Sequence, residues 1–209
     1  MHIIIYSRIS SGRLKKKALI KLSNKKKLIE QVICQAKLLV PATKIILATT
    51  KKAEDLTLCK IAKKHKINYY RGSNNDLINR TVGCCKKYKI KSFFRYCADR
   101  PIIDIKKIKK CISNSKKIKF DLMTTNYGND KIDEGFTIEI FNASSFKKML
   151  DYDLSDDDKE HIANYFYKKR KMFIIKRIKF SKNFKNGYKY TIDTIHDLVK
   201  MNFILKNYD

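Results

Sequence analysis

The sequence predicts an α/β fold, in which helices cover both faces of a parallel sheet. The first half of the 209-residue chain alternates short β-rich runs with longer helical patterns, and the connections between them are short. The chain is 44% hydrophobic, which is enough to bury a core and excludes bulk disorder. Because no Pro- or Ser-rich linker and no internal repeat is visible, we expect one domain over residues 1–209.

Strands and helices alternate in the first half. Strands are expected where β-branched and aromatic residues cluster, namely at His2–Tyr6, Lys44–Ala48, Ile67–Tyr70, Ser92–Cys97 and Phe120–Thr125. Helices are expected where apolar residues recur every three or four positions, namely at Leu28–Leu39, Ala53–His65, Asp76–Tyr88 and Asp104–Ser113. The clearest stripe is formed by Leu28, Val32, Ala36 and Leu39. A helix between successive strands allows those strands to run parallel.

The second half is less regular. Phe136–Phe141 alternates apolar and polar residues, as a half-exposed strand does. Further strands are predicted at Met172–Ile178 and Tyr188–Ile192, and helices at Ser144–Leu150, Asp156–Lys168 and Thr194–Leu205. Thr194 is the expected N-cap of the last helix. Ser181–Gly187 is the expected flexible loop.

The net charge of +28 is the most unusual feature of the composition, and it suggests an anionic partner. The excess is lysine, with 40 Lys against 8 Arg, and the lysines are spread along the whole chain. Because Lys, Ile, Asn and Tyr are the residues that an AT-rich genome over-supplies, we favour solvated lysines on exposed faces. A role in meeting an anionic ligand or surface stays open, and nucleic acid is an unlikely partner.

The sequence gives few signs of a special compartment. No apolar run approaches the roughly 18–20 residues that span a bilayer. The N-terminus lacks the basic and apolar stretches of a signal peptide. The six cysteines form no CxxC pair, so reduced thiols are expected and a zinc site is not. We therefore expect a cytoplasmic protein.

A loop rich in small and cationic residues follows the first strand. The small residues Ser10, Ser11 and Gly12 lie between Arg8 and Arg13, and Lys15-Lys16-Lys17 follow. Small residues let backbone N–H groups approach phosphate oxygens, and the cations neutralise their charge. The loop matches neither the P-loop nor the GxGxxG pattern. A polar surface loop is the alternative interpretation.

Two carboxylates follow predicted strands. Asp99 comes two residues after Ser92–Cys97, and Asp193 directly after Tyr188–Ile192. Carboxylates in such positions can hold Mg²⁺ and leave room for water and phosphate. Each also has a structural alternative, because Asp99 could be a turn residue before Pro101 and Asp193 could cap the last helix.

Seven segments in order carry a resemblance to a known family: RISSGRLKKKAL, ATT, RGSNNDLINR, RYCADRPIID, EGFTIEIF, EHI and TIDTIHDL. Over roughly residues 2–205 the chain resembles the spore-coat-polysaccharide type of cytidylyltransferase. That group is related to the CMP-sugar synthetases that activate 3-deoxy-octulosonate and sialic-acid-like sugars. The resemblance implies a nucleotide-binding three-layer α/β sandwich with a mostly parallel sheet, of the nucleotide-diphospho-sugar transferase type. It also implies a reaction of CTP with a sugar acid or sugar phosphate that needs Mg²⁺ and gives a CMP-sugar and pyrophosphate.

The resemblance also implies roles for individual residues. The expected metal ligands are Asp99 and Asp193, which form the catalytic set together with Arg13 and Lys17. The expected nucleotide-binding residues are Arg8, Ser10, Ser11, Gly12, Arg13, Lys17, Thr49, Gly72, Ser73, Arg80 and Ala98. The expected sugar-binding residues are Glu139, Glu160 and His161. A homodimer is implied as well, with the sugar site and the dimer contact around residues 136–180.

The chain departs from the family's first-loop pattern, R-x-G-S-x-R-L-P-G-K. Ser10 stands where the family has Gly, and Lys15-Lys16 replace Pro-Gly. A non-catalytic relative is therefore one alternative. Another is a glycosyltransferase that uses an NDP-sugar donor, although its DxD metal motif is replaced here by Ala98-Asp99-Arg100. A basic nucleic-acid-binding module ranks last, because no helix-turn-helix, zinc finger or RNP-type motif is present.

Overall fold

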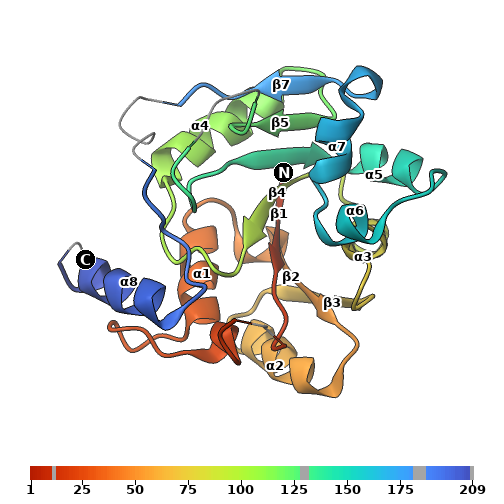
Figure 1. The fold of residues 1–209 in the computed structure, drawn as a ribbon. Coiled ribbons are helices and arrows are strands. Elements are labelled where there is room, and N and C mark those ends of the chain that lie inside the picture. Colours follow the sequence, from red (N-terminus) through yellow and green to blue (C-terminus); the bar gives the residue numbers. More distant parts are fainter. Residues whose placement is uncertain (11–12, 128–131, 181–186, 208–209) are drawn as a thin grey trace.

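The computed structural model describes residues 1–10, 13–127, 132–180 and 187–207. Within them one mixed sheet has the strand order β3-β2-β1-β4-β6-β5-β7 (Figure 1). The strands are β1 His2–Tyr6, β2 Ile45–Thr50, β3 Asn68–Gly72, β4 Ser92–Cys97, β5 Leu122–Thr124, β6 Glu139–Asn142 and β7 Ile175–Arg177. Only β6 runs antiparallel to its neighbours β4 and β5, and the other pairs are parallel. The predicted α/β fold with a mostly parallel sheet is confirmed.

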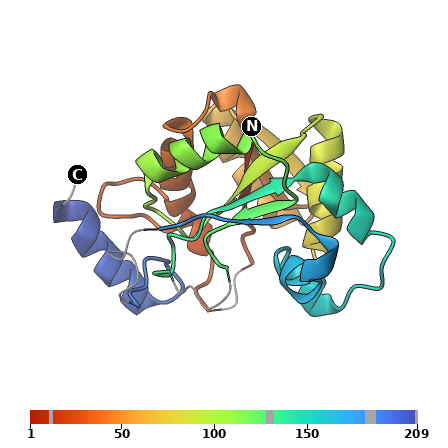
Figure 2. The same cartoon turned by 90° about the horizontal axis from the view of Figure 1, so that it is seen from above.

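Helices cover both faces of the sheet (Figures 1 and 2). They are α1 Leu28–Lys37, α2 Leu56–Lys64, α3 Leu77–Lys87, α4 Ile105–Ser115, α5 Ala143–Met149, α6 Asp156–Glu160, α7 Asn164–Lys168 and α8 Ile195–Asn207. The central strand β1 explains the two layers. Ile3 and Ile5 pack against the core beneath α1, α2, α4 and α8, whereas Ile4 and Tyr6 pack against the core beneath α3, α5 and α7. A run that is apolar at every position therefore fills both cores.

Polar side chains fix where several helices begin. The carboxylates of Asp76 and Asp104 each accept a backbone N–H three residues later, at 2.7 Å, and so cap α3 and α4. The Thr194 hydroxyl accepts the Asp197 N–H at 3.2 Å, which confirms it as the cap of α8. Because Thr194 holds the start of α8, it also fixes the position of Asp193 immediately before it.

Three predicted elements in the second half need correction. Tyr188–Ile192 is not a strand. It makes a single bridge, from Lys189 to Glu134, and then crosses the strand ends, where the Ile192 N–H donates to the Asp99 carbonyl. Met172–Ile178 contributes only β7, because a 3₁₀ turn occupies Arg170–Met172. The predicted helix Asp156–Lys168 breaks after α6, since His161 leaves the helical conformation and Ile162 turns into the core.

Two further predictions concern loops and membranes. Residues 181–186 of the expected loop Ser181–Gly187 lie outside the described residues, as do Ser11 and Gly12 of the first loop. No helix in the described parts of the chain is long and apolar enough to cross a membrane. All six cysteines are free thiols.

Candidate active site

A cavity of about 500 Å³ opens where the carboxyl ends of β1 and β4 lie side by side. Its lining comes from four separate segments of the chain, which the fold brings together. They are the loop after β1 (Ser7, Arg8, Ser10, Arg13, Lys17), the turn after β4 (Ala98, Asp99), the end of α6 (Glu160) and the residue Asp193. The carboxyl end of a sheet is where α/β proteins bind ligands. The structure thus gathers most of the first-loop cations and both predicted metal-binding carboxylates in one cavity.

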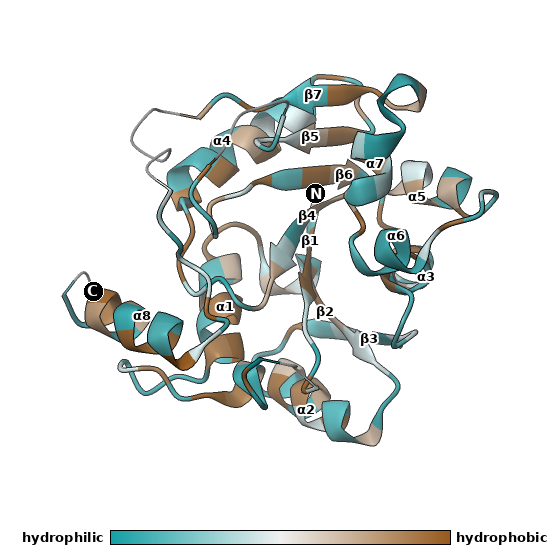
Figure 3. Cartoon of the chain, viewed as in Figure 1, coloured by the Kyte–Doolittle hydropathy of each residue, from teal (hydrophilic) through white to brown (hydrophobic). Residues whose placement is uncertain are grey.

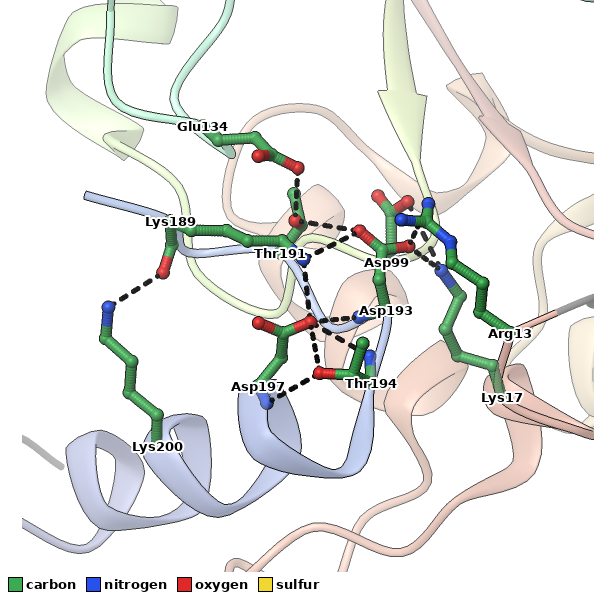
Figure 4. A network of polar contacts seen from close by, with 10 residues as sticks. All are labelled: Arg13, Lys17, Asp99, Glu134, Lys189, Thr191, Asp193, Thr194, Asp197 and Lys200. Atoms are coloured by element: carbon green, nitrogen blue, oxygen red, sulfur yellow. Dashed lines mark hydrogen bonds and ion pairs between the residues drawn. The ribbon is translucent and has the colours of Figure 1, made fainter. Parts of the chain in front are cut away.

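Lys17 lies between the two carboxylates (Figure 4). Its Nζ is 2.8 Å from Asp193 Oδ1 and 3.5 Å from Asp99 Oδ2. Arg13 approaches from the solvent side, with its guanidinium 3.2 Å from the same oxygen of Asp193. All of these groups come from loops that follow or cross strand ends, so the sheet fixes their spacing. The site therefore holds two anions and two cations within contact distance.

Asp193 is the best-supported carboxylate of the site, and its side chain is only 9% exposed. Its second oxygen accepts from Lys189 Nζ and from the Thr191 hydroxyl, both at 3.2 Å. Thr191 is held in turn by Glu134, at 2.7 Å. Burial alone would raise the pKa of Asp193, but the hydrogen bonds and charges of Lys17 and Lys189 outweigh burial, and the pKa lies below its ordinary value. Asp193 is therefore ionised at neutral pH.

Asp99 is much less supported. Among the described residues its Oδ2 contacts Lys17 alone, and its Oδ1 is buried with no hydrogen-bond partner. A buried carboxylate oxygen without a partner is costly unless a ligand satisfies it. Among the described residues no three metal-ligating side chains cluster, so Asp99 and Asp193 would form a two-carboxylate site. That donor set fits Mg²⁺, which is typically held by one or two carboxylates, water and substrate phosphates.

A second hollow, of about 450 Å³, adjoins the first, since Tyr6, Ser7, Arg8 and Glu160 line both. Arg8 reaches Glu160 across the shared boundary, with 3.3 Å between the guanidinium and the carboxylate. Arg80 lines the far side, where its guanidinium donates to the Ser73 and Asn74 carbonyls at 2.8 and 3.1 Å. Arg80 is buried and holds the loop after β3 in shape.

Gly72 explains how Arg80 can lie so close to that loop. A Cβ at position 72 would come within 2.7 Å of Arg80 Cγ and 2.8 Å of the Tyr70 ring, closer than packed atoms allow. Gly72 and Ser73 therefore shape the second hollow through Arg80 and do not line it. Their predicted roles as direct nucleotide contacts stay predictions.

Three other predicted site residues lie away from the two hollows. Thr49 is fully buried in β2. Glu139 is buried in β6, where its carboxylate meets Arg95 at 2.6 Å and accepts from the Tyr167 hydroxyl at 3.3 Å. His161 is exposed beyond α6 and lines neither hollow, whereas its neighbour Glu160 lines both. The predicted sugar-site trio is therefore divided between the core and the surface.

The sequence analysis missed Asp55, which positions the first loop. Asp55 is fully buried; its Oδ1 accepts the Ile9 N–H at 2.7 Å, and its Oδ2 accepts the N–H and hydroxyl of Thr50. It thus ties the loop after β1 to the end of β2. In the sequence it is simply part of the predicted helix Ala53–His65. An acid directly before the first residue of an apolar stripe offers no signal of this long-range contact.

Comparisons with known proteins identify the family of the chain. The family model described as cytidylyltransferase matches residues 2–207. The uncharacterized protein MJ1063 of Methanocaldococcus jannaschii is 28% identical over 207 residues, which cover 99% of this chain and 83% of that protein. A cytidylyltransferase structure from Leptospira borgpetersenii superimposes with a TM-score of 0.91 at 25% identity, covering 100% of this chain and 87% of that one. A CMP:2-keto-3-deoxy-manno-octonic acid synthetase complexed with CTP shares the fold, with a TM-score of 0.71 at 12% identity and 98% of each chain covered.

Proposed function

The chain belongs to the cytidylyltransferase family of nucleotidyltransferases, and from that premise we propose that it transfers CMP from CTP to a hydroxyl of a sugar acid or sugar phosphate. The products are a CMP-sugar and pyrophosphate. The observation that carries the proposal is the arrangement of Asp99, Lys17 and Asp193 at the carboxyl ends of β1 and β4. A cation between two carboxylates, with further arginines around it, suits a ligand that brings both phosphates and a metal ion.

The cations of the first loop bind the triphosphate in this proposal. Arg13 and Lys17 reach the carboxylates from one side of the cavity, and Arg8 lies where the two hollows meet. In the transfer, a substrate hydroxyl forms a bond to the α-phosphorus of CTP, and the bond to the bridging oxygen of pyrophosphate breaks. The cations stabilise the charge that develops on the leaving pyrophosphate. The proton of the hydroxyl leaves to solvent or to a nearby base.

Asp99 and Asp193 would hold Mg²⁺, and Asp99 Oδ1, which no described residue hydrogen-bonds, would be one of the ligand atoms. When bound, the ion supplies charge neutralisation on the phosphates and lowers the pKa of a hydroxyl next to it. Without the ion, Lys17 offsets one of the two negative charges, because its single ammonium contacts both carboxylates. Arg13 and Lys189 contribute further positive charge at Asp193. Lys17 can then move its hydrogen bonds to phosphate oxygens when the nucleotide enters.

The second hollow is the proposed place for the rest of the ligand. It is lined by Asn74, Asn75 and Arg80, and Asn side chains offer donors and acceptors for a base or a sugar hydroxyl. Glu160, at the boundary, is the proposed sugar-side residue, because it lines both hollows and its pair with Arg8 is exposed, whereas Glu139 is buried against Arg95 and lines neither. The acceptor sugar belongs to surface-polysaccharide or glycan biosynthesis in this proposal.

Three further assignments follow the family. We propose a cytoplasmic enzyme, which agrees with six free thiols and with the supply of CTP in that compartment. We propose a homodimer that forms through residues around 136–180. We also propose that the CTP base is chosen by size, since a pyrimidine occupies less of the second hollow than a purine does.

The decisive experiment measures pyrophosphate release with each of the four nucleoside triphosphates, against a panel of sugar acids and sugar phosphates. We expect turnover with CTP in the presence of Mg²⁺ and none after chelation with EDTA. Equal turnover with ATP or GTP, or turnover that persists in EDTA, would contradict the proposal. Hydrolysis of an NDP-sugar without any pyrophosphate release would favour the glycosyltransferase alternative.

A further inference from the structure

One face of α8 carries three large apolar side chains in solvent. Ile195, Val199 and Phe203 are spaced by four residues, so they form one stripe along the helix. They are 70%, 64% and 68% exposed, whereas Met201 and Leu205 on the opposite face are buried in the core. The helix is thus already anchored by one apolar face. The outer stripe, which we call the α8 ridge, is a second apolar face with no partner among the described residues.

Cations lie on both sides of the α8 ridge. On one side the Ser23 N–H donates to Asn202 at 2.8 Å and ties the hairpin Lys21–Lys27 to α8, as Figure 1 also shows. On the other side Lys200 lies over the Tyr188 ring at 5.6 Å. By helical periodicity the α8 ridge lies between Asn202 and Lys200. The exposed cations of this surface are Lys21, Lys25, Lys26, Lys200 and Lys206.

Among the described residues, acidic groups are nearly absent from the same surface. The segment 18–29, which contains the hairpin, has no Asp or Glu. The only acid in the described part of α8 is Asp197. Its carboxylate forms an ion pair with Lys189 at 2.7 Å and accepts a hydrogen bond from the Thr194 hydroxyl. Figure 3 shows the hydrophobic and hydrophilic segments alternating along α8. The surface therefore combines an exposed apolar ridge with unneutralised lysines.

We propose that this surface docks onto an anionic lipid bilayer, with the α8 ridge in the headgroup region and the lysines on lipid phosphates. An apolar helix face flanked by Lys is the arrangement that lies in a membrane interface. Each lysine near an anionic leaflet adds to the attraction. The cavity of the proposed active site is lined by no residue of α8, so the docking surface and that cavity are formed by different side chains.

A second copy of the chain is a poorer occupant. The three ridge side chains offer on the order of 300–400 Å² of apolar surface, against roughly 800 Å² per partner in a stable interface. Pairing two such surfaces would also bring lysines against lysines. A protein partner that inserts a side chain into a pocket is not favoured either. None of the described cavities, which measure about 450 to 620 Å³, is lined by a residue of α8. A fluid anionic surface needs neither a pocket nor a complementary shape.

The chain contains no tryptophan, so a single Trp reports insertion cleanly. We expect the emission of Phe203→Trp to shift to the blue on vesicles of phosphatidylcholine with about 30% phosphatidylglycerol, and not on phosphatidylcholine alone. Leu150→Trp is the matched control, since Leu150 is also exposed, at 43%, but follows α5. It should not shift. No shift at position 203, or equal shifts at both positions, would overturn the proposal.

A second measurement separates insertion from general attraction by the net charge. The double variant Val199→Ser with Phe203→Ser keeps every charge, and we expect it to co-sediment with the anionic vesicles roughly tenfold more weakly than wild type. Unchanged co-sedimentation would mean that the net charge of the protein alone accounts for its binding to the vesicles. If wild type sediments as a dimer in solution and the double variant as a monomer, the α8 ridge is instead the contact with a second copy of the chain. Either result overturns the proposal. Pyrophosphate release in solution should be the same in the variant, so failure here is distinguishable from failure of the proposed function.

Discussion

The two carboxylates of the site should respond differently to the same substitution. Asp99→Asn and Asp193→Asn each keep the side-chain shape and remove one negative charge. Within the described parts of the chain Asp99 makes one side-chain contact, at 3.5 Å from Lys17, and its Oδ1 has no hydrogen-bond partner. Asp193 contacts Lys17, Arg13 and Lys189 and accepts from Thr191. The structure therefore predicts that only one of the two substitutions lowers stability.

The magnitudes follow from these contacts. A hydrogen bond to a charged group contributes about 1.5–3 kcal/mol, and exposed partners contribute much less. Arg13 is 71% exposed and counts for little, so Lys17 and Lys189 carry the effect. We expect Asp193→Asn to cost about 2 kcal/mol, or about 4–8 °C in melting temperature for a chain of this length. Asp99→Asn should cost less than about 0.5 kcal/mol, because the contact that it weakens among the described residues is one long ion pair, at 3.5 Å, with a partly exposed side chain.

Activity should not follow stability in this pair. Both variants lose a proposed metal ligand, so we expect kcat to fall by about 100-fold or more in each. The assay combines thermal melts at pH 7 with pyrophosphate release at saturating CTP over a Mg²⁺ titration. Early melting of Asp99→Asn, together with full activity of Asp193→Asn, would refute the reasoning. Asp99 would then be a structural turn residue, and Asp193 would only support the start of α8.

Four further predictions test the loop and the strand that carry the site. Arg13→Ala and Lys17→Ala should each raise the KM for CTP about tenfold in steady-state assays, with the fold intact by circular dichroism; unchanged KM in both would make the loop a mere surface loop. Lys16→Gly should raise the melting temperature by about 1–3 °C, because Lys16 has a left-handed conformation with φ 53° that favours glycine. Asp55→Asn should lower stability by about 1–3 kcal/mol in urea unfolding and raise KM more than it lowers kcat, since an amide cannot accept all the donors that Asp55 holds. Burial and, to a smaller extent, the charge of Lys44 lower the pKa of His2 to about 4. As the pH drops below 6.5, the unfolded chain therefore binds a proton at His2 before the folded chain does, and the free energy of unfolding should fall down to about pH 4. His2→Gln should flatten that part of a plot of melting temperature against pH.

The strands and helices of the first half were predictable because each has its own local signal. β1 and β4 match their predicted bounds, and α3 begins at the capping residue Asp76. The second half was harder because tertiary contacts decide it. Tyr188–Ile192 has the composition of a strand, yet its backbone is held by Glu134 and Asp99 at the strand ends instead of by a neighbouring strand. No local pattern records that preference.

The site was predictable to the extent that strand ends meet at one edge of a sheet. That argument placed both Asp99 and Asp193 beside the basic first loop, although the segment before Asp193 makes only a bridge and is not a strand. The strand-end argument could not show that Glu139 forms an ion pair with Arg95, because that contact depends on β4 and β6 being neighbours in the sheet. Burial and pairing across strands are properties of the assembled fold, so a residue type in a promising segment does not reveal whether it is free to bind.

The first loop shows how a departure from a family pattern can leave a site intact. The family has Pro-Gly where this chain has Lys15-Lys16, and glycine would take the left-handed conformation at position 16 without strain. Lys16 adopts that conformation nevertheless, with φ 53° and ψ 31°, and the following 3₁₀ turn Lys17–Leu19 begins in place. Lys17 therefore still reaches Asp193 at 2.8 Å. The cost of the substitution is local backbone strain, held by buried Ala18 and by the Asp55 anchor at Ile9. Because the geometry at Lys17 survives, the altered loop argues for a working enzyme with a less stable loop and against a relative that has lost its site.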